Sequence, residues 1–239
     1  MKIALIGYGK MGKAIEQIAV SRGHEIVLKV GIENLEDNTV EKISVADVAI
    51  EFTGPESAFE NVKRCIDAGV PVVCGSTGWL KDLRQAEAYS VAGQTGFLYA
   101  SNFSIGVNIF FALNQKLAKL MSQQPDYQVT LTEIHHTEKK DAPSGTAITL
   151  AEQVIKLIPD KKTWVNRMSA DNSVLPIISE RVDPAPGTHI VKYQSVIDEI
   201  EIKHTAHSRQ GFAVGAVLAA EFLKQKKGVF NMNDVLAIS

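Results

Sequence analysis

Short apolar runs alternate with stretches of helical periodicity through the first hundred residues. Residues 2–6 form an apolar run rich in β-branched side chains that ends at Gly7, as expected for a buried parallel strand. Helical periodicity follows over residues 10–22, with Met11, Ile15 and Ile18 on one face. Strands that alternate with helices indicate βαβ units around a parallel sheet. Further strands are predicted at residues 25–30, 45–52, 70–74 and 96–100, and helices near 55–68 and 80–92.

The pattern changes after about residue 104. The periodicity predicts a long helix over 105–122, a strand of an open sheet over 127–134 and another helix over 146–158. Residues 159–188 are rich in proline, charge and turn formers, so we expect surface loop with short strands there. Two antiparallel strands and an apolar helix are predicted after this loop, at residues 189–196, 199–204 and 211–224.

Composition and charge narrow the classes of function. The 239 residues are 45% hydrophobic, and 25 basic and 27 acidic side chains give a net charge of −2. Such a balance draws neither nucleic acid nor an anionic membrane, so neither is expected as a partner. Two cysteines, Cys65 and Cys74, are too few for a disulfide framework and suit a reducing compartment. The chain has no span of membrane length and no signal-peptide core, which predicts a soluble, cytoplasmic protein.

A glycine-rich motif follows the first predicted strand. Gly7, Gly9 and Gly12 form the pattern G-x-G-x-x-G, which leads from the strand into the predicted helix. In a dinucleotide-binding loop the first glycine permits a tight turn, the second lets a pyrophosphate approach the backbone, and the third allows close helix packing. The alternative is a glycine-rich turn that binds nothing. The position between strand and helix favours the nucleotide.

The choice between the two nicotinamide cofactors is left open by two conflicting side chains. Glu33 stands at a suitable distance from the glycines to bind the ribose hydroxyls, which favours NAD. Lys29 lies nearby and would attract the additional phosphate of NADP. We therefore expect NADH, NADPH or both.

The most informative chemistry lies in residues 133–147. A predicted strand ends in two adjacent histidines, His135 and His136, and Lys139 follows four residues after the first. A proline-containing turn then leads through Ser-Gly-Thr into an apolar helix, whose start presents unpaired N–H groups and a positive dipole end. Each residue alone has an ordinary structural interpretation as a cap, a turn or a surface charge. Together they predict a binding site for a carboxylate or a phosphate.

A metal site is the other chemical interpretation of this segment. Glu133 and the two histidines are residue types that bind zinc. Adjacent histidines in a strand point to opposite faces, however, so His135 and His136 are poor joint ligands. We therefore expect no metal.

At this point the sequence resembles a known family. The stretch His-His-Thr-Glu-Lys-Lys-Asp-Ala-Pro-Ser-Gly-Thr-Ala, residues 135–147, is similar to the long and specific signature of the 4-hydroxy-tetrahydrodipicolinate reductases. The glycine loop resembles the family's loop but is one residue shorter than is common. The resemblance covers nearly the whole chain, because matching segments also occur at residues 7–12, 51–53, 75–78, 100–104, 187–189 and 207–209.

The resemblance implies a fold and a reaction. The fold is α/β, with a Rossmann-type doubly wound parallel sheet and a second α+β domain built on an open mixed sheet. Residues 1–104 plus 210–239 would bind the dinucleotide, and residues 105–209 would bind substrate and form a homotetramer. The family uses NADH or NADPH to reduce a cyclic dicarboxylate, 4-hydroxy-tetrahydrodipicolinate, to tetrahydrodipicolinate in lysine and diaminopimelate synthesis.

The resemblance also implies roles for individual residues. His135 matches the family's catalytic histidine and Lys139 its proton donor. The substrate contacts match His136, Gly145 and Thr146, to which the charge argument adds Lys140 as a further contact for a substrate carboxylate. The cofactor contacts match Gly7, Tyr8, Gly9, Lys10, Met11, Gly12, Gly75, Ser76, Thr77, Ala100, Ser101, Asn102 and Phe103, to which the spacing argument adds Glu33.

The proton donor and two other kinds of function stay open at this stage. A protonated lysine beside a dianionic substrate favours Lys139 as the direct donor, with His135 orienting or recharging it. One alternative function is an amino-acid dehydrogenase of the same architecture that acts on a small carboxylate. The other is a non-catalytic sensor that binds NAD(H) and a partner protein, although a sensor needs only the nucleotide loop. Regulation by lysine is also not determined by the sequence.

Overall fold

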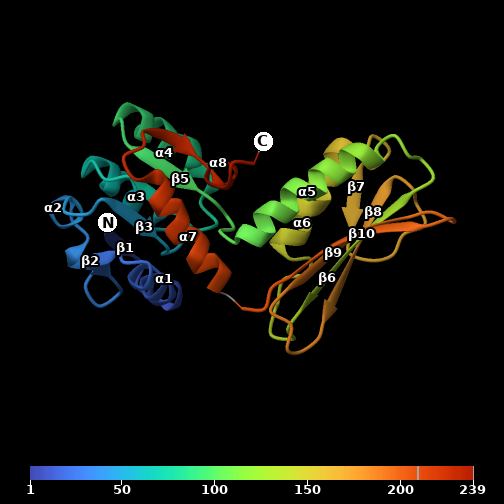
Figure 1. Ribbon diagram of the computed structural model, residues 1–239, viewed down its shortest axis with the longest axis horizontal. Coiled ribbons are helices and arrows are strands. Elements are labelled where there is room, and N and C mark those ends of the chain that lie inside the picture. Colours follow the sequence, from blue (N-terminus) through green and yellow to red (C-terminus); the bar gives the residue numbers. More distant parts are fainter. Residues whose placement is uncertain (209, 239) are drawn as a thin grey trace. The chain divides into compact units, whose positions relative to one another are not determined.

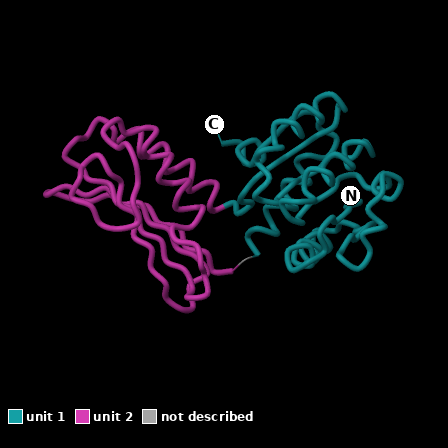
Figure 2. Tube along the Cα trace, turned by 180° about the vertical axis from the view of Figure 1, so that it is seen from behind, with its two compact units in different colours: residues 1–105, 210–239 teal, residues 106–209 magenta. Residues whose placement is uncertain are grey.

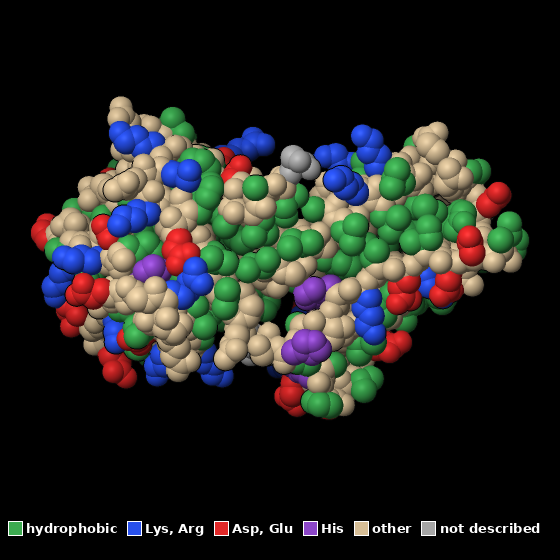
Figure 3. Space-filling view, in the orientation of Figure 1, with side chains coloured by type: hydrophobic (Ala, Val, Ile, Leu, Met, Phe, Trp, Pro, Cys, Tyr) green, Lys and Arg blue, Asp and Glu red, His purple; other side chains and the backbone are tan. Residues whose placement is uncertain are grey.

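The computed structural model describes residues 1–208 and 210–238 of the chain. Within it the chain forms two compact units (Figure 2): one holds residues 1–105 and 210–239, and the other residues 106–209. Throughout the described residues, each helix is too short or too polar to cross a membrane. Basic and acidic side chains are interspersed on the face seen in Figure 3.

The first unit is built on a six-stranded parallel sheet (Figure 1). Its strand order is β11-β5-β4-β3-β1-β2. The strands are β1 (Lys2–Ile6), β2 (Glu25–Val30), β3 (Val48–Glu51), β4 (Val72–Cys74), β5 (Gly96–Tyr99) and β11 (Gly228–Phe230). The helices are α1 (Lys10–Ser21), α2 (Val40–Ile43), α3 (Ala58–Asp67), α4 (Leu80–Ala92), α7 (Gln210–Leu223) and α8 (Met232–Leu236), with a 3-10 turn at Leu35–Asp37.

The alternation of side chains along β1 divides the core of this unit in two. Ile3 and Leu5 point to the face that packs against α1 and α7, whereas Ala4 and Ile6 point to the face covered by α3 and α4. Because both faces are covered, the strand is apolar throughout except at Lys2. This is the doubly wound parallel arrangement that the sequence predicts.

The second unit is a five-stranded mixed sheet with two long helices on one face (Figure 1). Its strand order is β10-β9-β6-β8-β7, in which β6 runs parallel to β8 and antiparallel to β9. The strands are β6 (Gln128–His135), β7 (Thr163–Val165), β8 (Val174–Arg181), β9 (Thr188–Gln194) and β10 (Glu199–Thr205). The helices are α5 (Ile105–Met121) and α6 (Gly145–Leu157).

Alternation along β6 determines where its polar residues lie. Val129, Leu131, Glu133 and His135 are all buried on the face that packs against the helices. The last two positions of an apolar row are therefore occupied by a carboxylate and an imidazole. This places both groups next to the loop that leads from β6 into α6.

One region of the second unit differs from expectation. The region predicted over residues 159–188 as surface loop with short strands contains β8, an eight-residue strand that pairs with β6 near the middle of the sheet. Pro176 and the charged pair Glu180-Arg181 interrupt the apolar run and hide the strand pattern. Pro176 lies in the part of β8 that pairs only with the short edge strand β7, one residue before the pairing with β6 begins at Ile177.

Candidate functional site

The glycine loop between β1 and α1 uses its glycines for different purposes. Gly7 has φ of +102°, and a Cβ there would lie 2.0 Å from the carbonyl oxygen of Phe52. A Cβ on Gly12 would lie 2.5 Å from the carbonyl oxygen of Gly7. A Cβ on Gly9 meets nothing within 4 Å. Gly7 and Gly12 are thus required by the fold, whereas Gly9 leaves open space for a ligand.

A cavity of about 810 Å³ opens beside this loop. It lies where the carboxyl ends of β1, β2 and β3 meet, at the edge of the sheet where nucleotides bind in open α/β folds. Four of the predicted cofactor residues line it: Gly7, Tyr8, Gly9 and Glu33. Its wall also contains Lys13, Asn34, Asn38, Phe52, Thr53 and Asn61.

Lys29 and Glu33, the two residues that bear on cofactor preference, have different surroundings in the structure. The ammonium of Lys29 lies 2.5 Å from the Glu16 carboxylate and 5.2 Å from the centre of the Tyr8 ring. The hydrogen bond with Glu16 raises the pKa of Lys29. The charge of Lys29 is therefore already balanced within the protein, while Glu33 is exposed and lines the cavity.

A buried carboxylate joins the two strand ends behind this cavity. Glu51, at the end of β3, is fully buried, and its Oε1 accepts hydrogen bonds from the Thr53 N–H at 3.1 Å and the Ser76 hydroxyl at 3.1 Å. Its other oxygen accepts from the Cys74 thiol at 2.9 Å. Ser76 in turn accepts from the Thr53 N–H at 2.8 Å. Residues 53 and 76, which follow β3 and β4, are therefore held together by one side chain.

The remaining predicted cofactor residues are placed as follows. Phe103 as a whole residue is only 1% exposed and packs in the core, so it offers almost no accessible surface to a nucleotide. Met11 packs against the same core, and Thr77 is exposed. The structure does not place Lys10, Met11, Gly12, residues 75–77 or residues 100–103 in the wall of the cavity.

The predicted chemical residues of the second unit lie at the end of β6 and in the loop that follows it. His135 is 7% exposed, whereas Lys139 lies in the loop and donates to both oxygens of Asp141, at 2.8 and 2.9 Å. Lys140 is exposed, and His136 is half-buried.

The loop ends at the N-terminus of α6, which presents backbone N–H groups. Ser144 is the N-cap residue, and its hydroxyl accepts from the Ala147 N–H at 3.2 Å. A Cβ on Gly145 would meet nothing within 4 Å, so the helix start is open on that side. Thr146 follows in the first turn. This geometry suits an anionic group.

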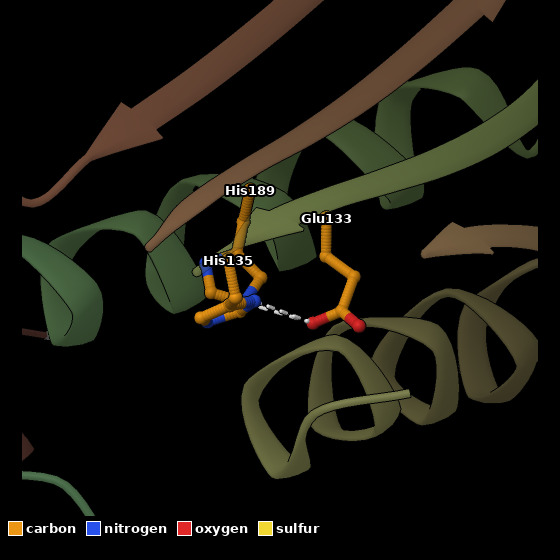
Figure 4. A group of neighbouring side chains, drawn as sticks. All are labelled: Glu133, His135 and His189. Atoms are coloured by element: carbon orange, nitrogen blue, oxygen red, sulfur yellow. Dashed lines mark ion pairs between the residues drawn. The ribbon is translucent and has the colours of Figure 1, made fainter. Parts of the chain in front are cut away.

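Glu133 is the central polar group of this region (Figure 4). Its Oε1 accepts from Arg181 at 3.0 Å, and its Oε2 accepts from the Ser144 N–H at 3.2 Å. Nδ1 of His135 lies 3.0 Å from Oε2, and Nε2 of His189 lies 4.0 Å from it. The carboxylate is fully buried.

The electrostatics of this cluster follow from burial and from these contacts. Burial raises the pKa of Glu133, but the nearby His135 imidazole and the groups that donate from Ser144 and Arg181 outweigh it and hold the pKa well below its usual range. Burial lowers the pKa of His189 to about 4, and the neighbouring His135 acts in the same direction. The cluster at neutral pH therefore contains an ionised carboxylate and a neutral His189.

Sequence reasoning missed the roles of Arg181 and His189 in this cluster. Register explains both: Glu133 pairs with His189 across β9, and His135 pairs with Arg181 across β8. Residues directly opposite each other in paired strands lie on the same face of the sheet. The match of residues 187–189 to the family motif was the available signal for His189, but only the strand pairing brings it to Glu133. In the space-filling view, histidine side chains gather on this unit (Figure 3).

A metal-ligating arrangement also exists in this cluster. Ligand atoms of Glu133, His135 and His189 all lie within 4.8 Å of one another. His189, and not the adjacent His136, completes this group with Glu133 and His135. Both oxygens of the carboxylate already accept hydrogen bonds from protein donors, one of them the Arg181 cation. A divalent cation would have to compete with that cation, so the contacts favour an internal ion pair.

Comparison with known proteins places the chain in a family. Residues 1–103 match the family described as dihydrodipicolinate reductase, N-terminus, and residues 106–236 match its C-terminus. A 4-hydroxy-tetrahydrodipicolinate reductase of Christiangramia forsetii is 50% identical over 99% of this chain and 98% of its own. A reductase of the same name from Methanosarcina barkeri is 37% identical, over 87% of this chain and 78% of its own.

A solved structure agrees with the fold. Dipicolinate-bound dihydrodipicolinate reductase from Paenisporosarcina sp. TG-14 has a TM-score of 0.78 and 24% identity to this chain, and 98% of each chain is covered. Both halves of the sequence thus match one family, and the two sheets have the arrangement of that fold. The chain belongs to the dihydrodipicolinate reductase family.

Proposed function

We propose that this chain catalyses the NAD(P)H-dependent reduction of 4-hydroxy-tetrahydrodipicolinate to tetrahydrodipicolinate in lysine and diaminopimelate synthesis. The observation that carries the proposal is the arrangement after β6. There Lys139 already binds a carboxylate, that of Asp141, close in sequence to the open N-terminus of α6. A dicarboxylate substrate needs two such anion-binding groups.

Each unit has its own part in the proposal. Residues 1–104 with 210–239 bind the nicotinamide dinucleotide, with the pyrophosphate over Gly9 and the ribose near Glu33. The cavity of about 810 Å³ beside these residues supports this assignment. Residues 105–209 bind the substrate, whose carboxylates are held by Lys139, Lys140, His136 and the backbone at Gly145 and Thr146.

The chemical step needs a hydride on one atom of the conjugated imine and a proton on another. The reduced nicotinamide supplies the hydride. Lys139 holds a substrate carboxylate and donates the proton, and His135, four residues earlier at the end of β6, orients or recharges it. Loss of water from the hydroxylated substrate precedes the reduction.

We also propose that the protein is a cytoplasmic homotetramer assembled through the sheet of the second unit. Helices α5 and α6 cover one face of that sheet. Strand β10 forms one edge of the sheet and is largely exposed, including Ile200 at 41%. An uncovered sheet face with an open edge strand is suited to pairing with further copies. The buried free thiols of Cys65 and Cys74 are typical of a reducing compartment.

A single assay tests the proposed reaction. The synthase-generated substrate is mixed with the protein and either NADH or NADPH, and loss of absorbance of the reduced nicotinamide is followed. Aspartate-semialdehyde and oxaloacetate serve as control substrates for an amino-acid dehydrogenase. We expect oxidation only with the synthase-generated substrate. Oxidation with a control substrate alone, or none at all with a folded protein, would contradict the proposal.

A further inference from the structure

We propose that Glu133 is a positioning residue that orients His135 and, through Arg181, the loop that carries Lys139. The inference rests on the proposed function, because it assigns a further residue to the same site. Neither Glu133 nor Arg181 belongs to the set of residues that the sequence motif assigns to catalysis or binding.

The first observation is that protein donors occupy both carboxylate oxygens. One oxygen accepts from the Arg181 guanidinium and the other from the Ser144 N–H. The side chain is fully buried at the end of an otherwise apolar row of β6. A buried carboxylate is retained at such a cost only when its charge is well satisfied, so its contacts determine the local arrangement.

The second observation connects the Glu133 carboxylate to the loop that carries Lys139. Arg181 donates through Nη2 to the carbonyl oxygen of Asp141 at 2.7 Å, and through Nε to that of Lys139 at 3.3 Å. One guanidinium therefore joins Glu133 to the backbone on both sides of Lys140. The backbone from which the Lys139 side chain extends is thus fixed to the end of β6.

The third observation concerns the tautomer of His135. Its Nδ1 is buried and has no aligned hydrogen-bond partner among the described residues, and Oε2 of Glu133 lies 3.0 Å away. A small rotation of the ring would align the two, and hydrogen bonds of this kind often tighten only in the substrate complex. A proton on Nδ1 directed at the carboxylate leaves Nε2 to face the reaction.

The surroundings of Nε2 agree with that assignment. A Cβ at position 187 would lie 3.1 Å from Nε2 of His135. Because Gly187 has no side chain, this edge of the ring is left uncrowded. The Ser144 hydroxyl lies 3.1 Å from Nε2 of His189, which gives that imidazole its own partner. The titratable and charged groups that face Glu133 are His135, His189 from β9 and Arg181 from β8, with Lys139 and Asp141 in the adjoining loop.

Glu133→Gln tests the inference with almost no change of shape. Whichever way the amide is turned, its NH₂ group faces a donor, either Arg181 or the Ser144 N–H. We expect kcat to fall at least about tenfold, because misplacing a catalytic group by an ångström can cost about a hundredfold. NADH affinity should stay within about twofold, because the nucleotide cavity lies in the other unit. The matched control is Glu180→Gln, an exposed residue of β8, and it should retain the kcat of the unsubstituted protein.

A second measurement determines the tautomer in the unsubstituted protein, so its result does not depend on the folding of Glu133→Gln. Long-range nitrogen–proton correlation spectra report the tautomer of each imidazole, and His135 is assigned by the loss of its signals in His135→Gln. At about pH 9, where an ordinary imidazole is neutral, we expect His135 to carry its proton on Nδ1. A proton on Nε2 instead would overturn the positioning role.

The outcomes separate this inference from the proposed function. If the unsubstituted protein oxidises NAD(P)H with the substrate and Glu133→Gln does so with equal kcat, the reaction stands and the positioning role is wrong. If the unsubstituted protein fails with this substrate, the proposed function is wrong, and the tautomer of His135 still decides whether Glu133 orients the imidazole. A purely structural role for Glu133 would lower the melting temperature but leave the kcat of the folded variant unchanged.

Discussion

The Lys139 ammonium and the Asp141 carboxylate form a bidentate ion pair, in which Nζ lies 2.8 Å from Oδ1 and 2.9 Å from Oδ2. Hydrogen bonding to Lys139 lowers the pKa of Asp141. Asp141 is thus an internal carboxylate at the place where the proposed substrate carboxylate binds. Because its carboxylate is 62% exposed, the pair is weak enough to be exchanged for a ligand.

Asp141→Asn should therefore tighten the binding of dicarboxylates. The variant removes the competing charge but keeps the shape of the side chain. We expect the inhibition constant of pyridine-2,6-dicarboxylate to fall by about two- to fivefold, as an exposed ion pair contributes at most about 1 kcal/mol. Competitive inhibition is measured at several substrate concentrations. Weaker inhibition of the variant would show that Asp141 supports the binding loop instead of competing for Lys139.

Replacement of Lys139 tests proton donation separately from charge. Lys139→Ala should lower kcat by about a hundredfold or more, the usual contribution of a positioned acid. Lys139→Arg keeps the positive charge but does not release a proton near neutral pH, so kcat should stay low in that variant as well. NADH affinity, measured by fluorescence titration, should be unchanged in both. Near-normal kcat in the arginine variant would leave Lys139 with a binding role only.

Gly9→Val tests the cofactor loop without disturbing the fold. The position has room for a Cβ within the protein, so the variant should fold and keep its melting temperature. A branched side chain would occupy the space into which a pyrophosphate must come, and NADH affinity should fall at least about tenfold, about 1.4 kcal/mol. Gly7→Ala is the contrasting variant: its Cβ would lie 2.0 Å from the Phe52 carbonyl oxygen, so it should lower the melting temperature. Unchanged NADH affinity in folded Gly9→Val would count against the cofactor assignment.

Glu51→Gln should destabilise the first unit. The groups that donate to the buried carboxylate include an N–H, a hydroxyl and a thiol, so an amide NH₂ in its place faces at least one donor. We expect the free energy of unfolding in urea to fall by about 1–3 kcal/mol, the cost of leaving a buried polar group unsatisfied. Glu56→Gln, on the exposed turn after β3, is the matched control and should change little. Equal stability of the two variants would show that Glu51 does not hold the strand ends together.

The stability of the second unit should decrease in mild acid because of His189. Its pKa in the folded protein is about 4, below the ordinary value of about 6.5, so the unfolded chain binds the proton more tightly. The stability contributed by neutral His189 is therefore complete above about pH 6.5 and is lost as the pH falls toward about 4. Urea unfolding at a series of pH values should show this slope, and His189→Asn should flatten it. The same slope in that variant would assign the acid sensitivity to other groups.

The fold of the first unit could be predicted from the sequence because its strands are covered on both faces. Each strand then appears as a short apolar run, and β2 was predicted with the bounds that the structure shows, Glu25–Val30. The short elements after α7 were not predicted, because β11 has three residues and α8 has five, too few for a periodic pattern.

In the second unit, some residues of the candidate site could be predicted from the local sequence pattern, whereas others are brought together only by strand pairing. The residues of the motif around His135 and Lys139 are contiguous in sequence, so they can be identified from that one segment. Arg181 lies on β8, a strand hidden by Pro176, and reaches Glu133 only through the register of β8 against β6. Contacts between residues 48 positions apart depend on strand pairing, which no local pattern encodes.

The second unit is an insertion in the first, because the chain leaves the first unit at residue 105 and returns to it at residue 210. Strand β11, which pairs with β5, and helix α7, which contributes Ala213, Val217 and Leu223 to the core, are therefore synthesised only after the whole second unit. At about 5 to 20 residues per second, a ribosome needs roughly 5 to 20 s to make the inserted hundred residues. During that interval the second unit can fold completely, while β5 stays an unpaired sheet edge beside apolar surface that α7 has yet to cover. The nascent chain is thus open to chaperones, and to aggregation, until α7 and β11 have been synthesised.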